Sequence, residues 1–156
     1  MNKHKLFTVI VTAAAAASLT VLLLAVGAQA HRSGADSLQL TVVATKLSTV
    51  DVPPLITNKH SPETPGDEVI AISKVNGAAS GHRYLTCAVT KTAPSIEKAL
   101  YACQVTYTLS HGTITAAGVV HLSGAATAAI TGGTGAYTGA RGVLHSRPGT
   151  DTLSLR

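Results

Sequence analysis

A glycine-rich stretch from Thr127 to Leu144, TAAITGGTGAYTGARGVL, constrains the fold of this chain more than any other segment. Residues 127–131 predict a strand, a glycine-dense turn follows, and Gly139 and Gly142 lead into a second strand. Because glycine adopts positive φ angles without a Cβ penalty, the backbone can bend sharply here and pack closely. Such a corner is typical of a closed antiparallel sheet.

The first thirty residues predict a secretory signal peptide. They contain a basic start at 3–5, an apolar run at 6–26 and a small-x-small site at 28–30, so we expect cleavage before His31. The alternative is an uncleaved membrane anchor, because the apolar run is long enough to span a bilayer. The cleavage site favours a secreted protein that has no membrane association after cleavage.

The remaining residues, 31–156, are enough for one domain with a single core. We divide them into an N-terminal strand with a Pro-containing loop, 31–65, and the remainder of the same β domain, 66–156. Removing Lys3 and Lys5 leaves 10 basic and 7 acidic residues, a net charge of +3. These charges form no basic run and the chain has no Trp, so we exclude nucleic-acid binding.

Alternating apolar and polar residues predict eight short strands and no helix after the signal peptide. This pattern indicates an all-β antiparallel barrel or sandwich. An eight-stranded barrel is just wide enough to hold one small ligand or to be filled by its own side chains. The expected strands are 37–47, 67–75, 83–90, 100–109, 113–122, 127–131, 140–146 and 150–155.

The two cysteines, Cys87 and Cys103, lie in strand-like runs separated by a hairpin-like segment. Antiparallel pairing brings them together, and an oxidising compartment favours a disulfide. Alternation places both on the apolar face of their strands. We expect the disulfide to contribute about 3 kcal/mol of stability in the chain-entropy view. Two cysteines without further ligands at metal spacing predict no metal site.

Three segments resemble the allene oxide cyclase and dirigent superfamily, small barrels of plants with bacterial relatives. They are Gly-Asp-Glu-Val at 66–69, the hairpin LSHGTITAAG at 109–118 and ITGGTGAYTGARG at 130–142. The third is the most specific, and the resemblance covers about residues 66–155. It implies an eight-stranded antiparallel barrel with an apolar cavity, commonly in an oligomer. The low charge and Thr-rich faces of this chain are compatible with a homo-oligomer, either dimer or trimer.

The chain departs from that superfamily at the acidic positions. Allene oxide cyclases use a carboxylate from the first strand, where this chain has Thr45 or a neighbour. Dirigent proteins use aspartates in the second strand and the glycine corner, where this chain has Ile72, Ser73 and Ala136. Only the arginine of the Ala-Arg-Gly element, Arg141, is kept. The resemblance therefore implies the fold without the plant acid.

Four residues are candidates for the site. Arg141 at the barrel mouth would stabilise a ligand oxyanion or carbonyl, or else pair with Asp67 or bond loop carbonyls. Asp67 would point into the barrel, or else cap the turn after Gly66. Tyr107 would offer its hydroxyl to a ligand, or fill the core with that hydroxyl bonded to a partner. Tyr137 would lie over the barrel end, or pack on the glycines.

Together these features predict a secreted barrel that binds a small apolar or phenolic molecule and steers its coupling or cyclisation. Confinement and orientation would supply the effect, with no cofactor. One alternative is a cofactor-free isomerase or cyclase that uses Arg141 and Tyr107 as catalytic groups. A second is a non-catalytic structural or interaction module whose barrel is filled by side chains.

Overall fold

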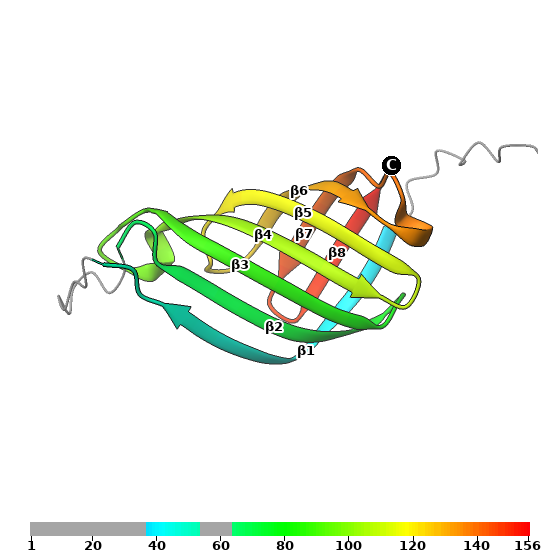
Figure 1. Ribbon diagram of the computed structural model, residues 1–156, viewed down its shortest axis with the longest axis horizontal. Coiled ribbons are helices and arrows are strands. Elements are labelled where there is room, and N and C mark those ends of the chain that lie inside the picture. The colour runs from blue at the N-terminus through cyan, green and yellow to red at the C-terminus, as the bar shows by residue number, and fades with distance from the viewer. Residues whose placement is uncertain (1–36, 54–63) are drawn as a thin grey trace, which may run out of the picture. The chain divides into compact units, whose positions relative to one another are not determined.

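The computed structural model describes residues 37–53 and 64–156, which form a closed barrel of eight antiparallel strands (Figure 1). Each strand pairs with its neighbours along the chain, and β8 pairs with β1. The barrel predicted from the sequence is confirmed. The predicted signal peptide and most of the Pro-containing loop lie outside the described residues. The strands are β1 (Ser37–Val50), β2 (Glu68–Gly77), β3 (Gly81–Lys91), β4 (Leu100–Leu109), β5 (Gly112–Val120), β6 (Ala126–Gly133), β7 (Gly142–Arg147) and β8 (Thr150–Leu155).

Strand β1 serves two parts of the barrel. Residues 37–41 pair with β8, whereas residues 40–50 pair with β2. A register shift follows Val43, and Ala44 adopts a φ of 49°, the left-handed region that non-glycine residues seldom occupy. Because this bulge inserts one extra residue, Val42 and Thr45 both line the barrel interior despite their odd spacing.

Two clusters of buried side chains fill the ends of the barrel. One, the packed cluster, includes Leu40, Val75, Leu109, Ile114 and Leu153. The other lies beside η1 (Ile96–Lys98) and comprises Cys87, Val89, Ala99 and Tyr101. The second short helix is η2 (Gly135–Tyr137). No helix among the described residues has the length and apolar character needed to cross a membrane.

The predicted glycine corner joins β6 to β7 through η2. A Cβ atom on Gly133 would lie 2.7 Å from the carbonyl oxygen of Thr113 and 2.9 Å from the Cβ of Tyr137. Gly135 has a φ of 61°. Glycine is therefore required for close approach at the first position and for backbone conformation at the second.

The predicted disulfide joins Cys87 of β3 to Cys103 of β4. The two residues are direct partners in the strand register, and their Cα atoms are 4.0 Å apart. The cystine faces the barrel interior, where Cys87 is fully buried. The prediction of a disulfide on the apolar face is confirmed.

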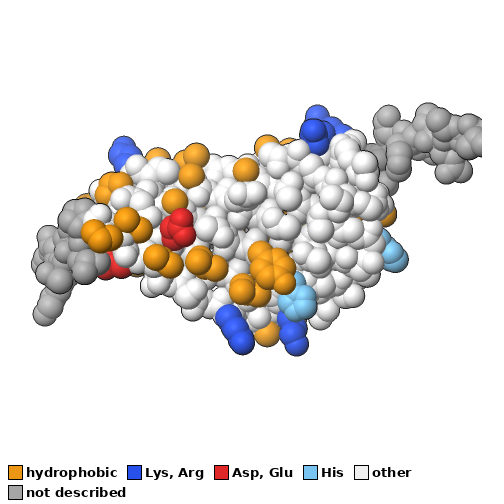
Figure 2. Space-filling model, in the orientation of Figure 1, with side chains coloured by type: hydrophobic (Ala, Val, Ile, Leu, Met, Phe, Trp, Pro, Cys, Tyr) orange, Lys and Arg blue, Asp and Glu red, His pale blue; other side chains and the backbone are white. Residues whose placement is uncertain are grey.

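The outer surface shown in Figure 2 has few charged side chains, and hydrophobic side chains lie scattered across it. Ile72 of β2 and Tyr84 of β3 are cross-strand partners on the outside of the barrel, 41% and 44% exposed. Paired exposed apolar side chains are compatible with assembly. The homo-oligomer stays a prediction.

Candidate functional site

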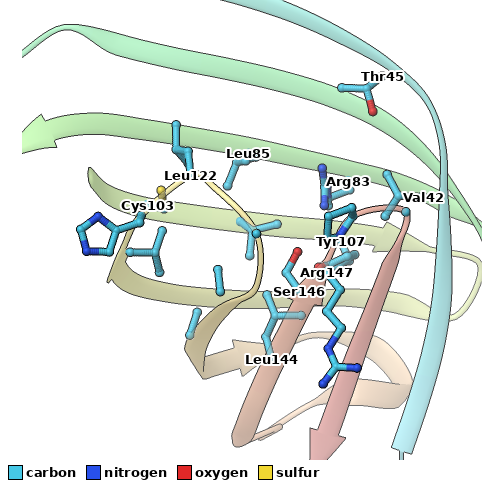
Figure 3. A pocket seen from close by; sticks show the side chains of 18 residues that line it. Val42, Thr45, Arg83, Leu85, Cys103, Tyr107, Leu122, Leu144, Ser146 and Arg147 are labelled. Atoms are coloured by element: carbon cyan, nitrogen blue, oxygen red, sulfur yellow. The ribbon is translucent and has the colours of Figure 1, made fainter. Parts of the chain in front are cut away.

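A cavity of about 340 Å³ lies inside the barrel, between the packed cluster and the cluster beside η1. Strands β3 to β7 and the loop after β5 supply most of its wall, and Figure 3 shows the lining side chains. The apolar part of this wall includes Leu85, Val105, Leu122, Ala128 and Leu144. Sulfur also borders the cavity, through Cys103.

One end of the cavity is closed by a buried ion pair and a tyrosine. Arg83 of β3 donates from Nη1 to Oδ2 of Asp151 on β8, over 3.0 Å. The hydroxyl of Tyr107, on β4, donates to the same oxygen over 2.7 Å. Asp151 and Tyr107 are fully buried, and the Arg83 side chain is 14% exposed. Since β8 is paired with neither β3 nor β4, these bonds cross the barrel interior.

The hydrogen bonding continues around the barrel wall through two hydroxyl groups. Arg83 Nη2 donates to Ser73 Oγ over 3.4 Å, and Ser73 Oγ lies 2.9 Å from Thr45 Oγ1. Thr45, Ser73, Arg83 and Tyr107 are successive cross-strand partners on β1 to β4, which is why they share one level of the barrel. We call these four residues and Asp151 the polar layer.

The polar layer divides the barrel interior into a filled part and a hollow part. Leu109 follows Tyr107 by two positions on β4, and Leu153 follows Asp151 by two positions on β8. Both leucines belong to the packed cluster. On the opposite side of the polar layer, Leu85 is two positions after Arg83 on β3 and Val105 is two positions before Tyr107 on β4. Both of these side chains line the cavity. The polar layer is therefore the floor of the cavity.

Tyr107 retains its proton in this setting. Burial, and next the negative charge of Asp151, raise the pKa of Tyr107 far above its usual range. Its hydroxyl hydrogen is committed to Asp151. Tyr107 is consequently a hydrogen-bond acceptor, but not a free donor, toward anything in the cavity.

Of the four residues predicted for the site, Tyr107 lines the cavity. Arg141 is exposed and donates from Nη1 to the carbonyl oxygen of Ala140, so its guanidinium bonds its own loop. Tyr137, in η2, packs against the packed cluster. Neither residue is part of the cavity wall.

Asp67 holds together the start of β2. Its Oδ1 accepts from the backbone N–H of Val52 over 2.9 Å and its Oδ2 from that of Thr64 over 2.6 Å. The hydroxyl of Thr64 also donates to Oδ1, over 3.0 Å. The bonds from the Thr64 and Val52 backbones lower the pKa of Asp67. This is the capping arrangement offered above as the alternative for Asp67, and it lies away from the cavity.

Sequence reasoning missed Arg83, Ser73 as a bonding partner, and Asp151. The available signal was the strand period, because Arg83 shares its parity with Leu85 and Cys87, on the apolar face of β3. Asp151 shares its parity with Leu153 in the same way. A charged residue in the apolar phase of a strand predicts either a buried pair or a site.

The described residues contain no group of three His, Cys, Asp or Glu side chains that could hold a metal ion. His121 borders the cavity at its far end, and its Nδ1 lies 2.9 Å from the carbonyl oxygen of Ala99. Arg147 contributes to the cavity rim, but Figure 3 shows its side chain directed away from Arg83 and Tyr107. The chemistry available in the cavity is thus that of the polar layer, the Ser146 hydroxyl and His121, set in a wall of mainly apolar side chains.

Comparison with known proteins gives a matching family and a set of similar solved structures, among them the two described below. The sequence model of the allene oxide cyclase barrel-like domain matches residues 66–156. A solved structure named pyocyanin demethylase is similar, with 25% identity, a TM-score of 0.63 and coverage of 78% of this chain and 100% of its own. Another is described as a nonspecific heme-binding cyclase that catalyses a [4 + 2] cycloaddition during neoabyssomicin biosynthesis. That structure has 18% identity, a TM-score of 0.49 and coverage of 77% of this chain and 62% of its own. A search of curated proteins found no significant match.

Proposed function

This chain belongs to the allene oxide cyclase barrel-like family, and from that premise we propose that its barrel binds one small apolar or phenolic molecule and steers its coupling or cyclisation. The observation that carries the proposal is the cavity of about 340 Å³ above the polar layer. Ligand pockets are typically a few hundred Å³, mostly apolar, with a few fixed polar groups. This cavity falls in that size range, and its wall combines apolar side chains with several polar groups.

The contrast between the two parts of the barrel also supports ligand binding. A structural module gains most from a barrel packed throughout, because dispersion and burial stabilise it. Here the packed cluster fills the part beyond the polar layer and continues into the cavity wall through Val105 and Leu144, whereas small side chains such as Ala126 and Ala128 leave the remaining space open. The pyocyanin demethylase neighbour, at 25% identity, further favours a small aromatic molecule as the occupant.

Steering would arise from shape. A rigid apolar wall holds a small molecule in few orientations, and orientation alone lowers a reaction barrier. The polar layer at one end fixes which end of the molecule points inward. No cofactor is required for this mode of action.

A cofactor-free isomerase or cyclase is the second candidate, and one observation favours it. The chain has a buried carboxylate, Asp151, within hydrogen-bond distance of a tyrosine that lines the cavity. Carboxylates and tyrosines are groups that transfer protons in enzymes. In this candidate Arg83 takes the part expected of Arg141, because Arg83 borders the cavity and Arg141 does not.

Native mass spectrometry of the mature protein, purified from its own secretion medium, tests the proposal. We expect an extra mass of small-molecule size that is lost on denaturation. Ala128→Phe fills the cavity and should abolish the extra mass. Ala129→Phe, at the neighbouring exposed position, should retain the extra mass. The same spectrum reports the assembly and whether cleavage precedes His31.

Titration with pyocyanin is the second experiment. Pyocyanin is chosen because one of the similar solved structures is named pyocyanin demethylase. Saturable binding that Ala128→Phe removes and Ala129→Phe keeps would support a ligand site. A protein that carries no extra mass and binds neither pyocyanin nor simple phenols would favour the structural or interaction module. Conversion of a bound molecule, lost in Asp151→Asn, would favour the isomerase or cyclase.

A further inference from the structure

We infer that Arg83 is the ligand-contacting group of this barrel and that the ligand binds as an oxyanion, a phenolate or enolate, with its oxygen at the guanidinium. This inference rests on the proposed function. It names the chemical class of the ligand and the residue that selects it. Asp151, Tyr107 and Ser73 are positioning residues that orient the guanidinium.

The first step is the charge of the cavity wall. Among the described residues, those that line the cavity include no Asp or Glu, and Arg83 is the charged residue of the polar layer that reaches the wall. Asp151 is fully buried behind it. A molecule in the cavity therefore meets the guanidinium before it meets the carboxylate.

The second step is the supply of donors. Within the described chain, Arg83 uses one N–H from Nη1 for Asp151 and one from Nη2 for Ser73. A guanidinium carries more N–H groups than these two bonds use, so its Nη atoms keep N–H groups to donate. The Nε of Arg83 and the Oδ1 of Asp151 also lack partners among the described residues, but both atoms are buried and do not face the cavity. Tyr107 has no proton to give, because its hydroxyl donates to Asp151. At the floor of the cavity, the spare charged donors thus come from Arg83, beside the neutral hydroxyl of Ser146 on the wall.

The third step is the low polarity of the surroundings. An anion in an apolar cavity is costly unless a charged donor contacts it, and a charged hydrogen bond is stronger there than in water. Arg83 is held by bonds to two other strands, so little reorganisation is needed when a ligand arrives. A neutral apolar molecule would leave these donors unsatisfied, and the site would discriminate against it.

The test is an absorbance titration of 4-nitrophenol with the full mature protein, because the phenol and its phenolate absorb at different wavelengths. A site that favours the oxyanion lowers the pKa of the bound phenol, since the phenolate then binds more tightly than the phenol. We expect a decrease of about one unit, equivalent to a tenfold preference for the phenolate. 4-Nitroanisole, which has no ionisable hydroxyl, measures the apolar part of the site alone.

The variants separate Arg83 from the fold. Arg83→Met with Asp151→Asn removes both charges together, so no buried charge is left unpaired. The pKa of bound 4-nitrophenol should then rise to its solution value or above, because the apolar cavity disfavours the phenolate. Lys74→Met removes a positive charge from the exposed outer face of β2 and should leave the decrease intact. Binding of 4-nitroanisole should persist in every one of these variants.

Three results would overturn the inference in distinguishable ways. If both probes bind but the pKa of bound 4-nitrophenol is unchanged or raised, the oxyanion assignment is wrong and the ligand cavity stands. The same conclusion follows if the decrease survives in the double variant. If neither probe binds at the highest concentration at which it is soluble, the proposed function fails together with the inference.

Discussion

The hydroxyl of Tyr107 donates a 2.7 Å hydrogen bond to Oδ2 of Asp151, although the two residues are 44 positions apart and lie on unpaired strands. With the 3.0 Å ion pair from Arg83 to the same oxygen, this bond ties opposite walls of the barrel together. The floor of the cavity is therefore also a structural cross-link. Experiments on these residues need to distinguish lost binding from lost folding.

Removing one member of the buried pair should cost more stability than removing both. Arg83→Met leaves the Asp151 carboxylate buried without its cation, and such a loss typically costs about 3–5 kcal/mol. Arg83→Met with Asp151→Asn should cost less than Arg83→Met alone, because no charge remains unpaired. Urea denaturation of the two variants measures the difference. With Asp151→Asn measured as well, a double-variant cost equal to the sum of the two single-variant costs would contradict the assignment of a coupled pair.

Tyr107 should not ionise while the protein is folded. Its ordinary pKa is 10.0, and burial and Asp151 raise it in the folded state. A group with a raised folded pKa contributes stability below the unfolded pKa and loses it as pH rises, so stability should fall above about pH 10. As pH is raised, tyrosinate absorbance should increase equally in the wild type and in Tyr107→Phe until each protein unfolds. Above about pH 10, the free energy of unfolding should fall less in Tyr107→Phe than in the wild type. A wild type with greater tyrosinate absorbance before unfolding would contradict the prediction.

Local pattern was sufficient to predict the barrel. The bounds expected for β4 and β8 and the start of β1 match the structure, and the other strand ends differ by one to three residues. The disulfide was also predictable, because Cys87 and Cys103 lie in adjacent strands in which the pairing is local. Each of these features depends on residues close together in the chain.

The polar layer was not predictable because it depends on how the barrel closes. Arg83 and Asp151 are 68 positions apart, and only the pairing of β8 with β1 brings them within 3.0 Å. Parity marks each residue as inward-facing, but it does not show which inward-facing residues meet across the barrel. The glycine corner predicted that Arg141 lies near the end of the barrel. Its hydrogen bond to the carbonyl oxygen of Ala140 depends on the backbone conformation of the loop, which the sequence pattern does not specify.

Asp67→Asn should weaken the protein at neutral pH and not in acid. Bonds from the Thr64 and Val52 backbones lower the pKa of Asp67 from its ordinary 3.8. A lowered folded pKa gives stability above the unfolded value, which is lost as pH falls through the folded pKa. The difference between wild type and variant in urea should therefore be largest at neutral pH and shrink below about pH 3.8. A difference independent of pH would show that the carboxylate charge is not what stabilises the turn.

The disulfide should stabilise the barrel by limiting the unfolded chain. Cys87 and Cys103 close a loop with a sequence separation of 16, for which the chain-entropy view gives about 3 kcal/mol. Replacing both with Ala should lower the thermal midpoint by several degrees, and reductant should destabilise the wild type and leave the variant unchanged. A variant that responds to reductant would indicate an effect unrelated to this bond.

The two adjacent glycines at the end of β6 should differ sharply in their tolerance of alanine. At Gly133 a Cβ would lie 2.7 Å from Thr113 O and 2.9 Å from the Cβ of Tyr137, so strand or η2 would have to move. At Gly132 the nearest atom to a Cβ would be Thr115 Oγ1 at 3.5 Å, an ordinary contact. Gly133→Ala should therefore cost about 1–3 kcal/mol, the usual range for overpacking, and Gly132→Ala little. Chemical denaturation of the pair measures this contrast, and equal costs would mean that the corner is flexible enough to absorb a methyl group at either position.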